Sequence, residues 1–447
     1  MAIQAFHFAS LNGIDSERNA SMNNVRLFIA FRVLFNARWY YPVMAVLFLD
    51  LGLSLAQYAM LNVAWAITIV CLEVPSGALA DQIGRKKMVV LAAILMVGEM
   101  LLFAFAPAGS IWLFPVLLLN RMLSGAAEAS ASGADEALAY DSLVDVGRED
   151  EWPSVLTSLM RWQAVGFFLA MLVGAAVFDA TLVQALVTFF GWGIAVSPTD
   201  TLRFPLYLTL ANACLVLVIA LNLSEPNAGR MTERVTIGST IRQSLRAAQW
   251  IGAGKTVLFV ILAGLCVDCA IRLFLTVNSN YYRLIGLPPA SFGLIASASA
   301  VIGFFTPRLS KALVARLSLT ANFALATTLA IAGLAVASAF FPIWGVFVVL
   351  PIGVSMSMLG FFVSHYLNRE VTDSSMRTTV LSFKGLAFNL AYGGIGALFA
   401  GFTTLRSDGG NQDSVFMEAM RWLPIFLIGI LIPVVVLGLK LRQSLKQ

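Results

Sequence analysis

The sequence predicts an all-α integral membrane protein with twelve transmembrane helices in two halves of six. The first observation is composition: of 447 residues, 59% are hydrophobic and only 12% are charged, with a mean hydropathy of +0.84. Soluble domains carry about 25% charged residues, so lipid must cover most of this chain. The region before Val25 has no apolar core followed by a small-residue cleavage site, so we expect no signal peptide.

The second observation is a series of twelve apolar segments, each near the ~20 residues that a membrane helix needs. They cover residues 27–50, 54–79, 88–107, 111–139, 155–178, 204–223, 256–279, 288–306, 318–339, 343–366, 377–402 and 421–441.

The third observation is the polar stretch 224–255, which separates six segments from six. We therefore predict an N-terminal bundle over 1–223, a cytoplasmic linker over 224–255 and a C-terminal bundle over 256–447. Apolar side chains in the linker recur at the spacing of one helical face, which favours an amphipathic helix on the membrane surface. They are Ile241, Leu245 and Ala248.

The loops predict orientation. Their lysines and arginines lie mostly on one side of the predicted membrane, which places both termini in the cytoplasm. The net charge of +5 arises from these loops and does not indicate nucleic-acid binding. The longest outer loop, 179–203, contains an apolar piece over 182–192 that is too short to span, so we expect it to be re-entrant or to lie on the surface.

Residues 77–87 carry a motif at the cytoplasmic end of the second segment. They read Gly-Ala-Leu-Ala-Asp-Gln-Ile-Gly-Arg-Lys-Lys. This stretch resembles the signature loop between helices 2 and 3 of the major facilitator superfamily, and seven positions match the family pattern. The matching positions are Gly77, Leu79, Asp81, Gly84, Arg85, Lys86 and Lys87.

The resemblance implies a secondary transporter that moves a small molecule across the bilayer by alternating access. It also implies a monomer in a bacterial inner membrane, with no cofactor and the proton gradient as energy source. The general resemblance is to efflux-type members of the family, and it does not identify a particular subgroup. The fifth segment lacks the proline of the glycine-proline motif that drug–proton antiporters carry, which argues against that particular subgroup.

For the motif, the resemblance implies a conformational lock at the inner side. Gly77 would let helix 2 approach helix 11 closely, and Gly84 would allow the turn into helix 3. Asp81 would lie near the N-terminus of helix 11, where free amides attract an anion. Arg85 needs an acid, and the end of the fourth segment supplies three, Asp135, Glu136 and Asp141. The alternative is that the basic residues only set topology.

The fourth segment carries a second resemblance. Arg121-Met-Leu-Ser-Gly125 is similar to the R-x-x-x-G motif of the same family. A polar stripe on a membrane helix must face protein or water, and here it would form one helical face. Its members are Arg121, Gly125, Glu128, Ser132 and Asp135. We expect Arg121 and Glu128 to form either a coupling path or a buried structural pair.

In this fold helices 1, 4, 7 and 10 line a central cavity, which points to a binding site near the midplane. Arg38 falls near the centre of the first segment, shortly before Tyr41, and we expect both to face the cavity. The alternative for Arg38 is a structural pair with Glu73 or Glu128.

The seventh segment places Asp268 at its middle and Arg272 one turn further. The pair either neutralises itself or acts as a coupling acid with a substrate-binding arginine. If Arg161 and Lys384 also face inward, cations outnumber acids there, which favours an anionic or zwitterionic substrate.

No enzyme or metal site is predicted. Cys266 and Cys269 form C-x-x-C, but the chain has only two histidines and no second cysteine pair, so we interpret both as packing residues. The main hypothesis is a proton-coupled exporter of a small organic molecule. The alternatives are an importer of an anionic nutrient, a lipid flippase and a non-transporting membrane sensor.

Overall fold

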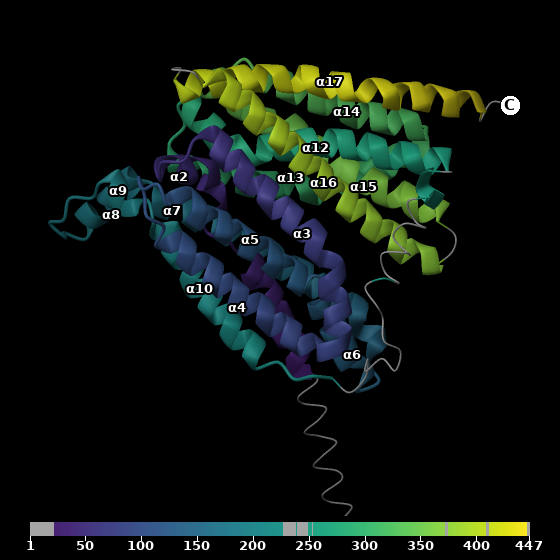
Figure 1. Ribbon diagram of the computed structural model, residues 1–447, viewed down its shortest axis with the longest axis horizontal. Coiled ribbons are helices and arrows are strands. Elements are labelled where there is room, and N and C mark those ends of the chain that lie inside the picture. Colours follow the sequence, from purple (N-terminus) through teal and green to yellow (C-terminus); the bar gives the residue numbers. More distant parts are fainter. Residues whose placement is uncertain are drawn as a thin grey trace, which may run out of the picture.

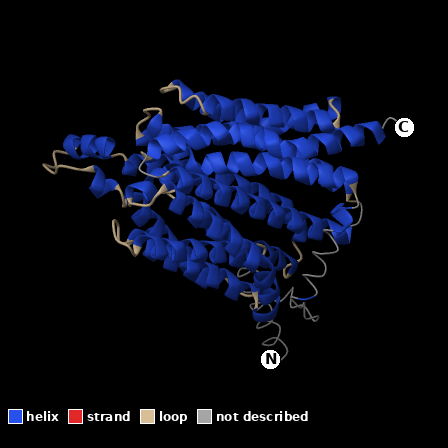
Figure 2. Cartoon of the chain, turned by 45° about the horizontal axis from the view of Figure 1, so that its top comes forward, coloured by secondary structure: helices blue, strands red, loops and turns tan. Residues whose placement is uncertain are grey.

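The computed structural model describes residues 22–226, 238, 249–252, 254–371, 374–407 and 411–444, without the side chains of 81, 304, 374–379 and 441–444. Within these ranges the regular elements are all helices (Figure 2). The amphipathic helix expected in the linker lies outside the described residues and stays a prediction.

The first half contains seven helices of ten or more residues after an initial helix over 22–36. Its elements are η1 (Tyr41–Val43), α2 (Met44–Asp50), α3 (Leu55–Ile83), α4 (Arg85–Ala104), α5 (Leu113–Ala131), α6 (Ala134–Val144), η2 (Glu149–Glu151), α7 (Trp152–Phe178), α8 (Ala180–Phe189), α9 (Pro198–Thr201) and α10 (Phe204–Leu221).

The second half is built from long helices. Its elements are α12 (Lys255–Leu284), α13 (Pro289–Arg316), α14 (Leu319–Ala337), η3 (Trp344–Val348), α15 (Val349–Glu370), α16 (Ser374–Arg406) and α17 (Gln412–Ser444).

Helix packing follows the two halves. In the first half α4 packs on α5 and α10, and α3 packs on α5; in the second half α12 packs on α15, α16 and α17. Among the described residues the halves meet mainly through α3 with α16, α7 with α13 and α2 with α12 (Figure 1), and η1 also packs on α13. We call the end of the bundle that carries α8 and α9 the α8 end, and the opposite end, which carries α6, the α6 end.

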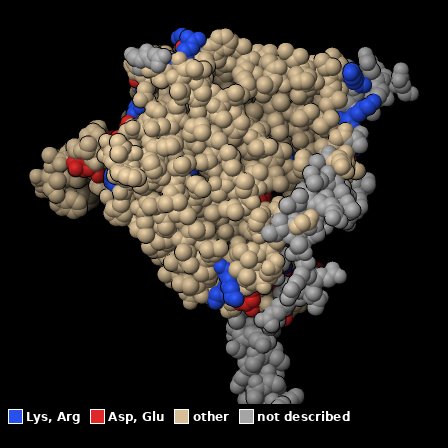
Figure 3. Space-filling view, viewed as in Figure 1, with Lys and Arg blue, Asp and Glu red and all other residues tan. Residues whose placement is uncertain are grey.

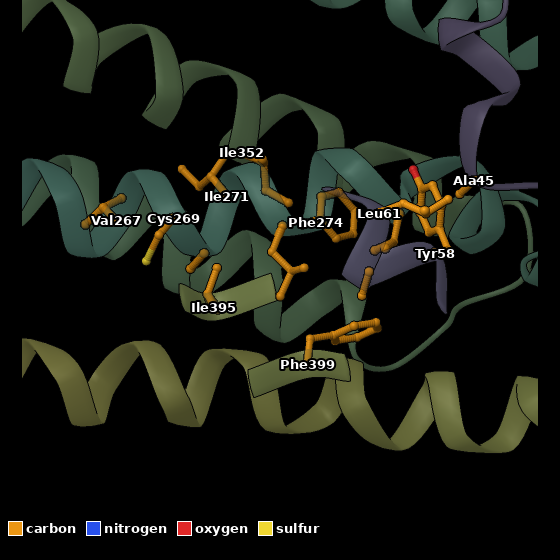
Figure 4. Packing of buried hydrophobic residues seen from close by; sticks show 14 of the residues in the cluster. Ala45, Tyr58, Leu61, Val267, Cys269, Ile271, Phe274, Ile352, Ile395 and Phe399 are labelled. Carbon is orange, nitrogen blue, oxygen red and sulfur yellow. The ribbon is translucent and has the colours of Figure 1, made fainter. Parts of the chain in front are cut away.

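The core is apolar and continuous across both halves. Near the α8 end, Tyr58 and Leu61 of α3 lie close to Phe274 of α12 and Phe399 of α16 (Figure 4). On the face shown in Figure 3 the charged side chains gather mostly toward the ends, and few charged side chains lie in the middle. An apolar belt with charged ends is what a bilayer requires of a spanning protein.

Ten helices in the described ranges are long and apolar enough to cross a membrane. The other two of the twelve predicted segments also form helices, but each departs from a single apolar span. The segment 27–50 is interrupted, and α5 carries Asn120, Arg121 and Glu128, which lower its hydropathy.

The interruption of the first segment lies at Ala37 and Arg38, between the helix over 22–36 and η1. Pro42 has no backbone N–H to continue a helix. The carbonyls freed by the break find a partner in α10, because the Asn212 side-chain amide donates to the oxygens of Leu34 (2.7 Å) and Ala37 (3.0 Å). A single membrane helix over 27–50 was expected, and the structure divides this segment at Ala37 and Arg38.

The fourth segment also breaks, at Ser132 and Gly133, where Gly133 adopts φ +76°. The polar stripe expected from Arg121 to Asp135 therefore ends with α5, and Asp135 belongs to the separate helix α6. The prediction of a single stripe was wrong because it assumed a helix without interruption.

The loop over 179–203 forms α8, which Asp179 caps by accepting from the amides of Thr181 (3.0 Å) and Leu182 (3.2 Å). It projects beyond α7 (Figure 1) and leaves Phe189 and Trp192 exposed.

Candidate functional site

A cavity of about 610 Å³ lies between the two halves. Its polar lining comes from both halves: Tyr41, Asn62, Trp65 and Arg121 from the first, and Arg272, Thr276, Asn278, Ser299, Ser357 and Tyr392 from the second. Aromatic and methionine side chains, including Phe167, Met171, Phe274, Phe292 and Met356, supply much of the remaining surface. A mostly apolar wall with few convergent polar groups is typical of a small-molecule site.

Arg121 is the main charged group that the first half contributes to this cavity. It is buried, with 6% of its surface exposed. Its Nη2 donates to Asn62 Oδ1 at 2.9 Å, and its guanidinium carbon lies 5.7 Å from the centre of the Trp65 ring. Its Nε is buried and has no hydrogen-bond partner in the described part of the chain. A buried donor without a hydrogen bond costs free energy, so the Nε–H of Arg121 is available to donate a hydrogen bond to a ligand.

Arg272 is its counterpart in the second half. Its Nη2 lies 2.9 Å from Asp268 Oδ2, its Nη1 donates to Asn389 Oδ1 at 2.9 Å, and it lies over the Tyr392 ring at 5.3 Å. The rings of Trp65 and Tyr392 meet edge to face, 6.4 Å apart. An aromatic pair therefore lies between the two arginines, one ring and one arginine from each half.

A smaller pocket of about 270 Å³ opens within the second half. Asp268, Lys384, Phe388 and Asn389 line it, and it shares Arg272 and Met356 with the central cavity. Asp268 thus lines this pocket and not the central cavity. Lys384 lines the smaller pocket, whereas Arg161 is exposed on α7 away from both cavities.

Arg38 does not line the central cavity or the smaller pocket, in contrast to our expectation. It is buried in an ion pair with Glu99 of α4, and its Nε donates to Phe35 O at 3.1 Å. Asn120 of α5 adds a 2.7 Å hydrogen bond to the Glu99 carbonyl oxygen. The break in the first segment turns Arg38 toward α4, and the alternative partners Glu73 and Glu128 are not used. Tyr41, three residues later, does line the cavity.

Sequence reasoning assigned no role to Glu99, although a lone carboxylate within an apolar segment was the available signal. The expected Arg121–Glu128 interaction is replaced by the contacts of Arg121 with Asn62 and Trp65. Seven residues of α5 separate Arg121 from Glu128, a rise of about 10 Å. Glu128 is half-buried and lies outside the cavity lining.

At the α6 end, the acids expected to face Arg85 divide among different partners. Arg85 pairs with Asp141 and donates to Ala137 O at 3.0 Å. Asp135 instead pairs with Arg32 at 3.0 Å, and Glu136 is exposed.

Sequence reasoning missed Glu225 at this cluster. Its two carboxylate oxygens accept from the backbone amides of Arg85 (2.8 Å) and Lys86 (2.9 Å), and so cap the N-terminus of α4. Gly84, the turn residue before α4, has φ +104° and lies against this carboxylate. An acid directly after the sixth apolar segment was the only sequence signal.

Two motif positions differ from expectation or stay open. A Cβ on Gly77 would have no described atom within 4 Å, so among the described residues Gly77 makes no close approach to α16 in this conformation. The close approach occurs toward the α8 end instead, where Cβ atoms on Gly393 and Gly396 would lie 3.5 Å from Ala66 and 3.1 Å from Val63. The Asp81 side chain and residues 372–373 lie outside the described residues, so the contact between Asp81 and helix 11 stays a prediction.

Comparison with known proteins now identifies the family. A family model described as Major Facilitator Superfamily matches residues 27–368. The chain belongs to the major facilitator superfamily. It is therefore a multi-pass membrane transporter of a small molecule and not an enzyme. A search of curated protein sequences gives no match.

Solved structures of superfamily transporters share the fold at low identity. The nucleoside transporter NupG has a TM-score of 0.71 and 13% identity over 94% of this chain and 99% of its own. A bacterial homologue of the human lysosomal transporter Spinster, inward-facing and unoccupied, has a TM-score of 0.69 and 17% identity, over 96% of this chain and 98% of its own. A D-xylose–proton symporter has a TM-score of 0.63 and 15% identity, over 91% of this chain and 97% of its own. At these identities the likeness shows the fold alone.

Contacts between the halves of this superfamily member gather at the α8 end. Arg283 of α12 pairs with Asp50 of α2 at 2.6 Å. Ser279 Oγ accepts from the amides of Ala45 (2.9 Å) and Val46 (3.2 Å) at the start of α2. Toward the α6 end α3 and α16 diverge (Figure 1), which agrees with the open space at Gly77.

Proposed function

We propose that the protein is a proton-coupled secondary transporter that exports a small organic anion or zwitterion by alternating access. It works as a monomer in a bacterial inner membrane with both termini in the cytoplasm, so the α8 end is the outer end. The observation that carries this proposal is the cavity between the halves, in which Arg121 and Arg272 flank the Trp65–Tyr392 aromatic pair.

The charge of the lining supports an anionic or zwitterionic substrate. Among the described residues, the charged side chains that line the central cavity and the smaller pocket are Arg121, Arg272, Lys384 and Asp268. Three cations face one acid, and an unbalanced charge at bilayer depth is costly unless a ligand or a function requires it.

The Asp268–Arg272 pair is the candidate coupling element. Arg272 contacts Asp268 and lines the cavity at the same time, so the protonation state of Asp268 would be linked to substrate binding at Arg272.

Alternating access would rock an N-terminal bundle (1–223) against a C-terminal bundle (256–447) around the cavity. Contacts between Asp50 and Arg283 at the outer end, with α3 and α16 apart at the inner end, correspond to an inward-facing state. The cluster of Arg85, Asp141 and Glu225 would hold the inner side of the first bundle in one geometry.

Flux in proteoliposomes tests the proposal. Purified protein is reconstituted, a pH gradient is imposed, and uptake of a panel of organic anions, zwitterions, sugars and nucleosides is measured. We expect gradient-driven flux of an anion or zwitterion that Arg121→Gln and Asp268→Asn reduce at least tenfold. Flux that Asp268→Asn leaves unchanged, or flux indifferent to the pH gradient, would contradict proton coupling through this pair.

Direction is measured separately. Comparison of inside-out with right-side-out vesicles distinguishes export from import of an anionic nutrient, the alternative on the same fold. If no class of solute in the panel shows flux, and cells carrying Arg121→Gln or Asp268→Asn keep the phenotype of cells with the unsubstituted protein, the result would support a non-transporting sensor.

A further inference from the structure

The smaller pocket in the second half adjoins the central cavity, since Arg272 and Met356 line both. We propose that this pocket is the seat of an anionic headgroup, a carboxylate or phosphate, held by Lys384 and Arg272, while the aromatic body of the same ligand lies against Trp65 and Tyr392. This inference rests on the proposed function and specifies the substrate class of its site: aromatic organic anions.

Lys384 provides the first argument. It lies on α16 within the pocket lining, half-buried, with its ammonium nitrogen 5.9 Å from the centre of the Phe388 ring. The acid in the described lining of this pocket, Asp268, is engaged by Arg272. Arg272 and Lys384 therefore share the single carboxylate of Asp268, and a bound anion would neutralise the positive charge that this carboxylate leaves unbalanced.

The shape of the pocket provides the second argument. Cβ atoms built on Gly360 or Gly385 would meet nothing within 4 Å, so the backbone leaves open space beside Lys384. A pocket of about 270 Å³ accommodates a carboxylate or phosphate with a few attached carbons, but not a drug-sized molecule as a whole. The rest of a larger ligand must extend past Arg272 into the central cavity.

The central cavity provides the third argument, because its surface suits a planar aromatic body. Trp65 and Tyr392 meet at an interplanar angle of 84°, and Phe167, Phe274 and Phe292 line the surrounding wall. Aromatic side chains favour offset or edge-to-face contact with a further ring. The buried Nε of Arg121, unpaired among the described residues, is available to a polar substituent on that ring.

A consequence concerns the ion pair. A headgroup at Lys384 and Arg272 competes with Asp268 for the same guanidinium, since Arg272 Nη2 contacts Asp268 Oδ2 at 2.9 Å. Removing the charge of Asp268 should therefore tighten anion binding, although the same substitution should abolish coupled flux.

The test measures ligand affinity by thermal shift on the full-length protein in detergent. The probes are 2-naphthoate, 2-naphthyl phosphate, the neutral 2-naphthamide and the non-aromatic cyclohexanecarboxylate. We expect the two naphthyl anions to stabilise the protein, with little effect of the amide and weaker binding of the cyclohexane acid. Whichever of 2-naphthoate and 2-naphthyl phosphate gives the larger thermal shift shows whether the headgroup is a carboxylate or a phosphate.

Variants locate the headgroup. Lys384→Gln should weaken binding of the anion at least tenfold, Lys384→Arg should retain it, and Asp268→Asn should strengthen it severalfold. Lys311→Gln, on an exposed lysine of α13 outside both cavities, is the matched control and should change nothing.

Three results would overturn the inference: equal responses to 2-naphthoate and 2-naphthamide, an unchanged anion affinity in Lys384→Gln, or no response to any of the probes. The flux assay keeps this outcome separate from the proposed function. Gradient-driven transport of a non-aromatic zwitterion that depends on Arg121 and Asp268 would contradict the inference that the substrate is an aromatic anion. The same result would still support the proposed transport function.

Discussion

The carbonyl oxygen of Trp39 rests directly on Gly174 of α7, in the space that a side chain at position 174 would occupy. The break in the first segment therefore depends on a glycine more than a hundred residues away. Trp39 also donates its amide to Thr209 Oγ1 at 3.2 Å, so α7 and α10 together hold the broken backbone.

Gly174→Ala should therefore destabilise the protein. The new methyl group would meet backbone atoms of Trp39, which cannot move aside as a flexible side chain could. We expect a loss typical of overpacking, about 1–3 kcal/mol, measured as a lower thermal midpoint in detergent. Gly98→Ala on α4 is the matched control, because its Cβ would meet only Leu123 Cδ1 at 3.8 Å. Equal midpoints for the two variants would show that Trp39 does not rest on Gly174.

The Arg38–Glu99 pair should contribute to stability and not to ligand binding. Glu99→Ala leaves the buried Arg38 charge without its partner, which costs about 3–5 kcal/mol. The double variant Arg38→Met with Glu99→Leu should recover much of this loss, since no charge then stays buried. Thermal midpoints of the single and double variants form the cycle. A large change in ligand affinity at unchanged stability would instead place Arg38 in the binding site.

Glu225 should protect the first amides of α4. Its carboxylate accepts from Arg85 and Lys86, and loss of an N-terminal cap costs about 1 kcal/mol. Glu225→Ala should therefore speed hydrogen exchange of these two amides by roughly fivefold, read by mass spectrometry of peptides spanning residue 85. Glu136→Ala, at an exposed acid of α6, serves as the control. Unchanged exchange in Glu225→Ala would mean that the carboxylate does not cap the helix in solution.

The Asp50–Arg283 pair should hold the α8 end closed. Both side chains are about 40% exposed, so water and salt limit the pair to at most about 1 kcal/mol. Asp50→Asn should then raise the population open at that end by up to roughly fivefold. The readout is the rate at which a membrane-impermeant maleimide, added at the α8 side, labels Ser299→Cys in the cavity, with Cys71 and Cys214 replaced beforehand.

Its control is Glu418→Gln, which removes an exposed ion pair with Arg406 that joins α16 to α17 within one half. An equal rise in the labelling rate of both variants would mean that losing any exposed ion pair makes the protein more flexible. It would contradict a specific role of the Asp50–Arg283 pair in holding the two halves together.

Short-range relationships were predictable from the sequence. Asp268 and Arg272 lie one turn apart on one helix, so their pairing follows from helix geometry alone. The turn at Gly84 and the proximity of Arg85 to the acids after α5 follow from a local motif and the order of helices. The inward orientation of Tyr41 was also expected and holds.

Long-range partners were not predictable in this way. Arg38 has several acids at similar membrane depth, and only the packing of α4 beside the broken first segment selects Glu99. Asp135 pairs with Arg32 and not with Arg85, because the break at Gly133 reorients α6. Gly77 has open space beside it among the described residues, because α3 and α16 approach each other nearer the α8 end, at Gly393 and Gly396.

The sequence by itself determined that lipid surrounds this chain, that its helices belong to the major facilitator superfamily, and that charges inside its membrane segments must be satisfied. The first and third properties follow from composition and local spacing, which do not depend on neighbours, and the second follows from the similarity of the sequence to the family. Only the tertiary structure decided which partner each charge takes and where the first and fourth segments break. The free energy of a buried ion pair or an interrupted helix depends on the side chains that adjacent helices supply, such as Glu99, Asn212 and Gly174.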